Sequence, residues 1–453
     1  MMRTSSHPLA LRLVVLVPLL LFGPGALQAE EPVRLLKTIP VPVSAANTTA
    51  GALYSFDISW VDQATGTYYL ADRSNKAVDI VDAAETAVTQ LAPNHGFAPF
   101  AGFTPCTPPA GANDCAGPNG VVAAFPWLFV TDAPSRVLSF DLRTTPPTTV
   151  SEAITHTGEP TRADELAYDP EDGLLLVINN AATPPFGTLI SVDKATGALT
   201  VGTQILLDAA HGVDATNGAE QPVWDPGTGK FYLSIPEISG DGATNLHGAV
   251  LRIATTGEVE AQYPVDLCGP AGLALGPQGD LLVGCNTVFD TAGGRWTGNA
   301  DRETQTAAPQ YVILDAATGT IDAHVLGVGA GDEVWFNAGD GRYYTASSGS
   351  PLAPNALTPA RPPVGTATTA PVLTAQGAAI LGVINALSQT LEQLVPTLNV
   401  PAVVAPAPNP HPAGTAHSVA AAAGTNHVFV PLAANNVFPD CLTGCIAVYG
   451  RSD

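Results

Sequence analysis

Residues 220–235 read EQPVWDPGTGKFYLSI. Two short apolar runs flank the segment DPGTG, whose Asp, Pro and Gly are the residues that tight chain reversals prefer. An apolar strand, a turn of this composition and a second apolar strand together predict a β-hairpin. The stretch therefore predicts antiparallel β-structure and sets the pattern to look for elsewhere in the chain.

The same pattern recurs along the chain. Further copies begin at Phe56, Asp164, Ala271, Asp332 and His417, and a degenerate copy begins at Gly120. Most copies are followed by a second hairpin, such as TLISVDKATGALTVG from residue 188. Two hairpins make four strands per repeat, which is typical of propeller blades. The sequence thus predicts an all-β fold, a seven-bladed β-propeller of four-stranded antiparallel blades.

The two chain ends are predicted to complete one blade together. The last copy, from His417, shows only three strands and ends in CIAVYG, whereas VRLLKTIPVPV from Val33 precedes the first repeat with no partner of its own. Pairing of this N-terminal strand with the last blade would close the ring. Closure also removes an exposed strand edge.

Residues 376–399 admit two interpretations. Ile380, Ile384, Leu387, Leu391 and Leu394 fall at helical spacing. The segment INALSQTLEQLV nevertheless aligns in register with LDAATGTIDAHV of the preceding repeat. We interpret it as the outer hairpin of the sixth blade, with a helix as the alternative.

The N-terminus has the composition of a secretory signal peptide. Arg3 and Arg12 precede an apolar run that extends from Leu13 to Phe22, and small residues precede Glu30. We expect residues 1–29 to be removed and 30–453 to form one domain without a transmembrane anchor, in the periplasm or secreted. Long loop insertions are expected at about 287–308, 347–375 and 400–414.

Six cysteines fall into three close pairs. An even number in an exported chain predicts disulfides, here Cys106–Cys115, Cys268–Cys285 and Cys441–Cys445. The spacing around the turn places Cys268 and Cys285 on facing strands of one hairpin.

The chain is strongly acidic. It has 40 Asp and Glu against 17 Lys and Arg, and loss of Arg3 and Arg12 leaves 15 − 40 = −25. Nucleic acid is a poor partner for such a chain, because phosphate binding needs basic residues. The sequence also lacks a nucleophile elbow, a Walker loop, a dinucleotide glycine motif and a zinc-protease helix.

Ligands of propellers bind at the axial mouth, where inner strands begin and where the second strand is joined to the third. The strand starts supply Asp57, Asn119, Asp164, Glu165, Glu220, Asp332, Glu333 and His417. The joining loops supply Asp72, Arg73, Asp132, Asn179, Asn180, Glu237, His247, Asn286 and Asn435.

This set is rich in oxygen ligands, which hard cations prefer. We expect Glu220, Glu165, Glu333 and His417 to surround a divalent cation, Ca²⁺ first, since clustered acids repel each other unless compensated. The alternative is that these side chains only cap strand ends and turns.

One blade carries a sharper resemblance. GAEQPVWDPGTGKFYLSIPE, residues 218–237, resembles the E-x-P-x-W blade of the gluconolactonase and senescence-marker lactonase family. That resemblance implies that Glu220 ligates a catalytic divalent cation and that Trp224 is a core residue. The family has six blades, however, and Ala271 and Gly272 stand here where its amide ligand is expected. The candidate substitutes from later blades are Asp332, Glu333 and His417.

The hairpin YYLADRSNKAVDIVDA, residues 68–83, resembles the YVTN and YncE-like propellers, which are seven-bladed and mostly binding proteins. Streptogramin lyases are similar in shape and use a mouth His with a divalent cation, which His417 and the acids would match.

Two functions follow. The first is a cation-dependent hydrolase of the lactonase type, or a lyase, in which the cation polarises a small ester or lactone and His417 or Glu333 moves the proton. The second is a non-enzymatic propeller that binds a small molecule, a metal or a protein partner.

Overall fold

The computed structural model describes residues 31–48, 51–103, 106, 113–215, 217–238, 247–289, 310–329, 331–350, 378–397, 417–435 and 438–451. The expected signal peptide and most of the three expected long loops lie outside these residues. Pro32–Asp453 clusters as one compact unit. No helix in the described part of the chain is long and apolar enough to span a membrane.

The described residues form 28 strands, grouped in seven four-stranded antiparallel blades. The first three blades contain β2 (Ser59–Asp62), β3 (Thr67–Asp72), β4 (Ala77–Val81) and β5 (Val88–Leu91); β6 (Val121–Ala124), β7 (Trp127–Asp132), β8 (Arg136–Asp141) and β9 (Thr148–Ile154); β10 (Leu166–Asp169), β11 (Leu174–Asn179), β12 (Phe186–Val192) and β13 (Leu199–Leu206). The fourth and fifth contain β14 (Pro222–Asp225), β15 (Lys230–Ile235), β16 (His247–Ile253) and β17 (Val259–Asp266); β18 (Cys268–Leu275), β19 (Asp280–Val288), β20 (Gln310–Asp315) and β21 (Ile321–Leu326). The last two contain β22 (Gly331–Asn337), β23 (Arg342–Ser350), β24 (Ala378–Asn385) and β25 (Thr390–Pro396); β26 (Ala420–Ala422), β27 (His427–Leu432), β28 (Cys445–Gly450) and β1 (Arg34–Pro40).

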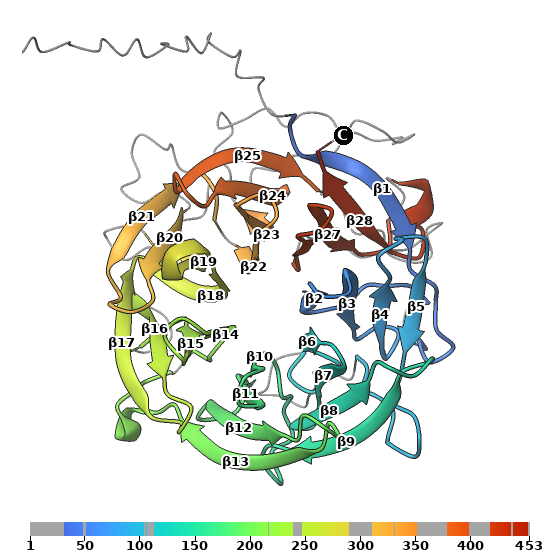
Figure 1. Cartoon of the computed structure of the whole chain (residues 1–453), viewed down its shortest axis with the longest axis horizontal. Helices are drawn as coiled ribbons and strands as arrows, with labels where there is room; N and C mark the ends of the chain where they lie inside the picture. The colour runs from blue at the N-terminus through green and yellow to red at the C-terminus, as the bar shows by residue number, and fades with distance from the viewer. Residues whose placement is uncertain are drawn as a thin grey trace, which may run out of the picture. The chain divides into compact units, whose positions relative to one another are not determined.

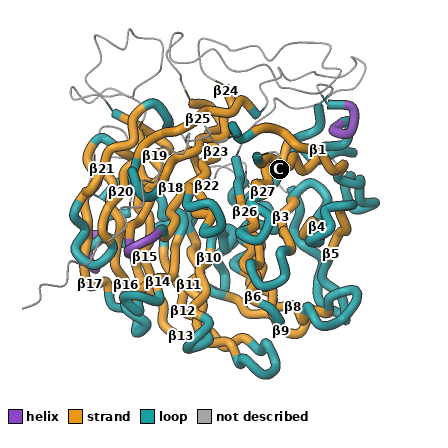
Figure 2. Tube along the Cα trace, turned by 45° about the horizontal axis from the view of Figure 1, so that its top comes forward, coloured by secondary structure: helices purple, strands orange, loops and turns teal. Residues whose placement is uncertain are grey.

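The blades form a ring, as predicted (Figure 1). The first strand of each blade is innermost, and β2, β6, β10, β14, β18, β22 and β26 contact one another in that order, with β26 returning to β2. One parallel bridge, His247 to Cys268, links the sheets of the fourth and fifth blades. Apart from three short helical turns, the described residues are strands and loops (Figure 2).

The recurrent Asp-initiated turn explains why the hairpins form. In the fourth blade Asp225 Oδ1 accepts a hydrogen bond from the Gly227 amide at 2.8 Å, and its Oδ2 accepts one from Thr228 Oγ1 at 2.7 Å. Gly229 then takes a φ of 65°, a conformation that glycine adopts without strain. Asp62, Thr65 and Gly66 repeat this arrangement in the first blade. The Asp, Thr and Gly residues therefore recur in the sequence because they stabilise the hairpin turns.

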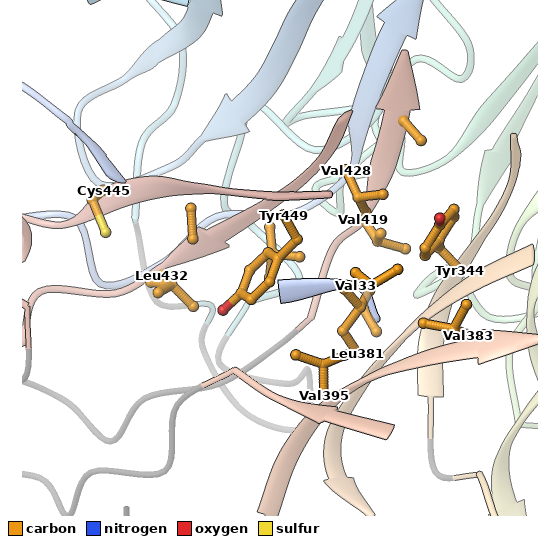
Figure 3. Packing of buried hydrophobic residues seen from close by; sticks show 14 of the residues in the cluster. Val33, Tyr344, Leu381, Val383, Val395, Val419, Val428, Leu432, Cys445 and Tyr449 are labelled. Atoms are coloured by element: carbon orange, nitrogen blue, oxygen red, sulfur yellow. The ribbon is translucent and has the colours of Figure 1, made fainter. Parts of the chain in front are cut away.

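The predicted closure is confirmed. β1 pairs antiparallel with β28, with Leu35 opposite Tyr449. Next to β1, the backbone of Val33 exchanges two 2.8 Å hydrogen bonds with the side-chain amide of Gln393 in the sixth blade. Val33 also joins Val395 and Tyr449 in a buried cluster between the sixth and seventh blades (Figure 3).

Residues 378–396 form the β24–β25 hairpin, which confirms the hairpin interpretation over the helical one. Ile380, Leu381, Val383 and Ile384 are all buried, because neighbouring blades cover both faces of this sheet. A strand covered on both faces is apolar at successive positions and loses its alternation. Burial on both faces accounts for Ile380 and Ile384 in β24. Leu387 lies in the exposed turn and Leu391 and Leu394 lie in β25, so the helical spacing arises from two strands and the turn between them.

All three predicted disulfides are confirmed, with Cα–Cα separations of 5.2, 5.1 and 4.8 Å in chain order. Cys268 and Cys285 lie on the facing strands β18 and β19, as expected. They are not directly opposite, because register shifts around Pro270 place that residue opposite Cys285.

Candidate ligand site at the axial mouth

The starts of the inner strands meet around a cavity of about 400 Å³. Seven of the eight predicted strand-start residues line it, namely Asp57, Asp164, Glu165, Glu220, Asp332, Glu333 and His417. Three of the predicted loop residues join them, namely Arg73, Asn180 and Asn286. The structure therefore brings together the four residues expected to hold a metal.

The other predicted mouth residues do not line the cavity. Asn119 lies behind it and accepts a 2.8 Å hydrogen bond from Arg73 Nε. Asp72, Asp132 and Asn435 make hydrogen bonds within their own loops. Asn179 donates to Ser135 of the preceding blade at 3.0 Å, and Glu237 is buried. The His247 side chain lies outside the described residues. Local capping thus applies to Asp72, Asp132 and Asn435.

Backbone pairing fixes where the mouth acids lie. The amide of Glu220 donates to the carbonyl of Ser234 at 2.9 Å, and the amide of Asp164 donates to that of Ile178 at 2.8 Å. Asp57 makes the same contact with Ala71 at 2.9 Å. Each inner strand therefore remains paired with the second strand of its blade as far as the acid, which holds the side chain at the rim.

His417 lies between two aspartates. Its Nε2 is 2.9 Å from Asp57 Oδ1 and its Nδ1 is 3.0 Å from Asp332 Oδ2. Burial lowers the pKa of His417, but the two carboxylates more than offset this and hold it well above the ordinary value. The imidazole is therefore a cation whose two N–H groups are both engaged.

Two arginines extend this arrangement. Arg73 pairs with Asp57 and lies 4.0 Å from Asp164. Arg162 donates to Asp164 Oδ2 at 2.8 Å. Charges thus alternate along a chain of side chains that runs Asp332, His417, Asp57, Arg73, Asp164, Arg162.

Arg162 was missed by the selection from the sequence. That selection began at the first residue of each inner strand, and Arg162 lies two positions earlier, in the loop before Asp164. Its signal was a basic residue beside a mouth acid in a chain with only 17 Lys and Arg. Such scarcity makes each basic residue near the axis informative.

Three glutamates remain outside this alternating chain. Burial raises the pKa of Glu220 to about 8, with further repulsion from Asp332 and Asp164 and an opposing effect of Arg162. Burial also raises the pKa of Glu165 well above its usual value, and Glu220 and Asp164 add to the effect. For Glu333, burial likewise raises the pKa well above the usual value, against the lowering effects of His417 and of Ser418.

Several buried polar atoms of cavity-lining residues have no hydrogen-bond partner. They include Glu165 Oε2, Glu333 Oε1, Asp164 Oδ1, Asn180 Oδ1 and Arg162 Nε. Such atoms are costly unless a ligand, an ion or water satisfies them. The second oxygen of Glu333 is held by Ser418 Oγ at 2.8 Å, so the side chain is fixed with one oxygen free.

The donor set suits a hard cation better than a transition metal. Carboxylate and amide oxygens predominate, whereas both nitrogens of His417 are engaged by aspartates. Among the described residues, no three His, Cys, Asp or Glu side chains are already gathered closely enough to hold a metal ion. A metal there would need side chains to move inward, or water to complete its shell.

Comparison with known proteins supports the fold alone. No protein-family profile matches the sequence, and no curated protein is similar to it in sequence. A chain in the "Crystal Structure of Mitotic Checkpoint Complex" is 10% identical with a TM-score of 0.55, covering 97% of this chain and 99% of that one. The "Structure of Dos1 propeller" is 11% identical with a TM-score of 0.51, covering 91% and 95%.

Proposed function

We propose that the axial mouth binds a positively charged ligand, for which a divalent cation such as Ca²⁺ is the simplest case. The observation that carries the proposal is the pair of buried, unpartnered oxygens Glu165 Oε2 and Glu333 Oε1 in a cavity that also contains Glu220. The protein would then be a binding propeller of an oxidising compartment, in keeping with its disulfides and signal-like N-terminus.

Counting charges supports a cationic ligand. The three basic groups of the mouth, Arg73, Arg162 and His417, are each engaged by aspartates. Among the described residues, no ion pair within 4.0 Å joins Glu165, Glu220 or Glu333 to a basic side chain, and the pKa values of all three are raised. A bound cation would stabilise their ionised forms and release the protons that they hold without it.

A hard cation would draw on these carboxylates and on the amide oxygens of Asn180 and Asn286. His417 would remain in place between its aspartates and orient them. An organic cation, such as a polyamine or a Lys or Arg side chain of a protein partner, needs less inward movement of the glutamates. Both kinds of ligand are positively charged, and separate titrations with Ca²⁺ and with spermidine distinguish them.

The second candidate is hydrolysis of an ester or lactone, or an elimination. It is favoured by the pKa of Glu220, which at about 8 keeps a carboxyl protonated at neutral pH in a cavity of ligand size. A bound cation would polarise a carbonyl group. In this scheme the proton comes from whichever of Glu220 and Glu333 does not ligate the cation and so keeps its proton, whereas the charged His417 is a donor and not a base.

The test is thermal melting of protein stripped with a chelator, titrated separately with Ca²⁺ and with spermidine. A ligand that binds only the folded state stabilises it by about 2.7 kcal/mol at a hundred times its dissociation constant. We expect one of the two to raise the melting temperature of the parent and to act much more weakly on Glu220→Gln. Glu258→Gln, at an exposed position, is the charge-matched control.

If neither cation changes the melting temperature, the proposed function fails. If Ca²⁺ binds, an aryl ester and an aromatic lactone are then assayed with and without the ion. Calcium-dependent turnover that Glu220→Gln abolishes would establish the second candidate, and its absence would leave the binding protein.

A further inference from the structure

A second cavity, of about 300 Å³, lies among the inner strands β2, β10, β14, β18 and β22. Trp60 follows Asp57 by three residues, and Tyr168 follows Glu165 by three. At about 3.3 Å per residue, these two rings lie about 10 Å along the strands from the acids of the mouth. The two cavities have no lining residue in common, but they adjoin each other along the inner strands, because Gln221 of the second directly follows Glu220 of the first.

The walls of this cavity are aromatic. Trp60, Tyr168, Trp224, Trp335 and Phe336 line it together with aliphatic side chains, and the described lining contains no charged side chain. Trp224 is thus only partly a core residue. Because no carboxylate of the described residues lines this cavity, a hard cation such as Ca²⁺ has no anionic oxygen ligand there, and the mostly apolar lining favours a neutral ligand.

The aromatic rings are held in place from behind. Trp60 packs edge-on against Trp335 with centroids 4.9 Å apart, and its Nε1 donates to the carbonyl of Ala123 at 2.9 Å. Tyr168 packs against Phe129 at 4.8 Å and Trp224 against Phe231 at 4.7 Å. Rings fixed in this way keep the cavity open, because they cannot rotate inward to fill it without losing these contacts.

One polar atom of the lining is unsatisfied. Trp335 Nε1 is buried and has no hydrogen-bond partner, although the indole nitrogen can only donate. Buried Trp N–H groups usually find an acceptor. Of the other polar side chains in the lining, Gln221 uses its Oε1 to accept from the Leu273 amide at 2.8 Å, and Trp60 donates its indole N–H to Ala123.

We propose that this cavity binds a neutral aromatic molecule that carries a carbonyl or ether oxygen, which accepts from Trp335 Nε1. An apolar cavity of about 150 Å³ is large enough for benzene, so about twice that volume holds a bicyclic ring system. Offset and edge-to-face contacts with the wall rings provide the attraction. This buried, unpartnered donor favours ligands that have an acceptor at one end.

The probe for this site is prodan, a neutral naphthalene ketone whose emission shifts to the blue in apolar surroundings. Three of the five tryptophans of the chain line the cavity, so excitation of tryptophan should sensitise the bound probe. We expect saturable binding of prodan by the full chain. The corresponding dimethylaminonaphthalene without the ketone should bind more weakly.

Two variants test the assignment. Trp335→Phe keeps a ring but removes the donor, and should weaken prodan binding about five- to tenfold and abolish the preference for the ketone. Val223→Phe places a ring into the cavity and should abolish binding of both probes. Trp127→Phe, which lies outside the cavity, and Glu220→Gln in the mouth should leave prodan binding unchanged.

Melting curves verify that the variants are folded. If Trp335→Phe does not fold, Val223→Phe alone tests whether prodan binds in this cavity. The proposal is refuted if the parent does not bind prodan up to the solubility limit of the probe. It is also refuted if Val223→Phe binds prodan as the parent does. Loss of prodan binding in Glu220→Gln would place the probe in the charged mouth and refute the assignment as well.

Discussion

Replacing Glu220 by glutamine removes an ionisable group that folding places in an unfavourable environment. Burial and the repulsion of Asp332 and Asp164 raise the pKa of Glu220 from 4.5 to about 8. Glutamine keeps the shape of the side chain and cannot ionise. We therefore expect Glu220→Gln to be more stable than the parent at high pH when no cation is present.

The direction in which the free energy of unfolding changes with pH follows from how many protons each state binds. Between pH 4.5 and about 8 the unfolded chain has lost the proton of Glu220 while the folded chain keeps it. The folded state then binds more protons, so the free energy of unfolding falls as the pH rises through this window. Each pKa unit is worth about 1.4 kcal/mol, so the advantage of the variant at pH 9 is of the order of 2–5 kcal/mol. Below pH 4.5 this contribution vanishes.

The assay is denaturant unfolding of chelator-treated protein at several pH values between 4 and 9. Glu258→Gln serves as control, since it removes the same charge from an exposed position of an acidic chain. Repeating the series with Ca²⁺ or spermidine should reverse the order at pH 9. The cation stabilises the ionised parent, whereas the variant has lost a ligand.

Two results would refute this reasoning. Stability curves of Glu220→Gln and the parent that run parallel from pH 4 to 9 would mean that Glu220 is not held in a raised-pKa environment. A gain in Glu258→Gln as large as in Glu220→Gln would attribute the effect to overall charge and not to the mouth.

Three further outcomes are expected. His417→Gln should lower the free energy of unfolding at pH 6 by about 3 kcal/mol, because it leaves two aspartates without their shared cation. Since folding raises the pKa of His417 above 6.5, this loss should shrink as the pH rises from 6.5 towards the raised value and be gone above it. Deleting residues 30–43 should expose the edge of β28 and cause aggregation, visible by light scattering, and unchanged melting would contradict the closure. Replacing Cys268 and Cys285 together by serine should cost about 3 kcal/mol for a loop of this length in denaturant unfolding, which an unaltered midpoint would disprove.

The fold was predictable because each blade repeats its own turn chemistry. Asp225, Thr228 and Gly229 stabilise a turn through contacts within that turn, so their presence in the sequence predicts a hairpin without knowledge of the rest of the chain. The register around Pro270 was not predictable, since the shifts on both sides of this proline depend on how β18 meets β19. Proline cannot donate to a ladder, which is a common origin of such irregularities.

The position of the site was predictable from the sequence, but the charge partners of its acids were predictable only in part. Strand starts placed Glu165, Glu220 and Glu333 at one mouth, because every blade presents the same edge to the axis. The expectation that a cation compensates these acids did not include Arg162 or the pairing of His417 with two aspartates. Pairings between blades far apart in sequence have no local signature.

The aspartates and glutamates of the mouth therefore have different tasks. His417 of the seventh blade joins Asp332 of the sixth to Asp57 of the first, across the junction where the chain ends close the ring. Ser418 strengthens that junction, because its hydroxyl is 2.6 Å from that of Ser59 and 2.8 Å from Glu333 Oε2. Interactions that hold blades together are unavailable to a ligand. Ligand binding is then left to the carboxylate oxygens with no such role, such as Glu165 Oε2 and Glu333 Oε1. Substitution of an aspartate should therefore weaken the junctions between blades, whereas Glu220→Gln should leave these junctions intact and weaken cation binding.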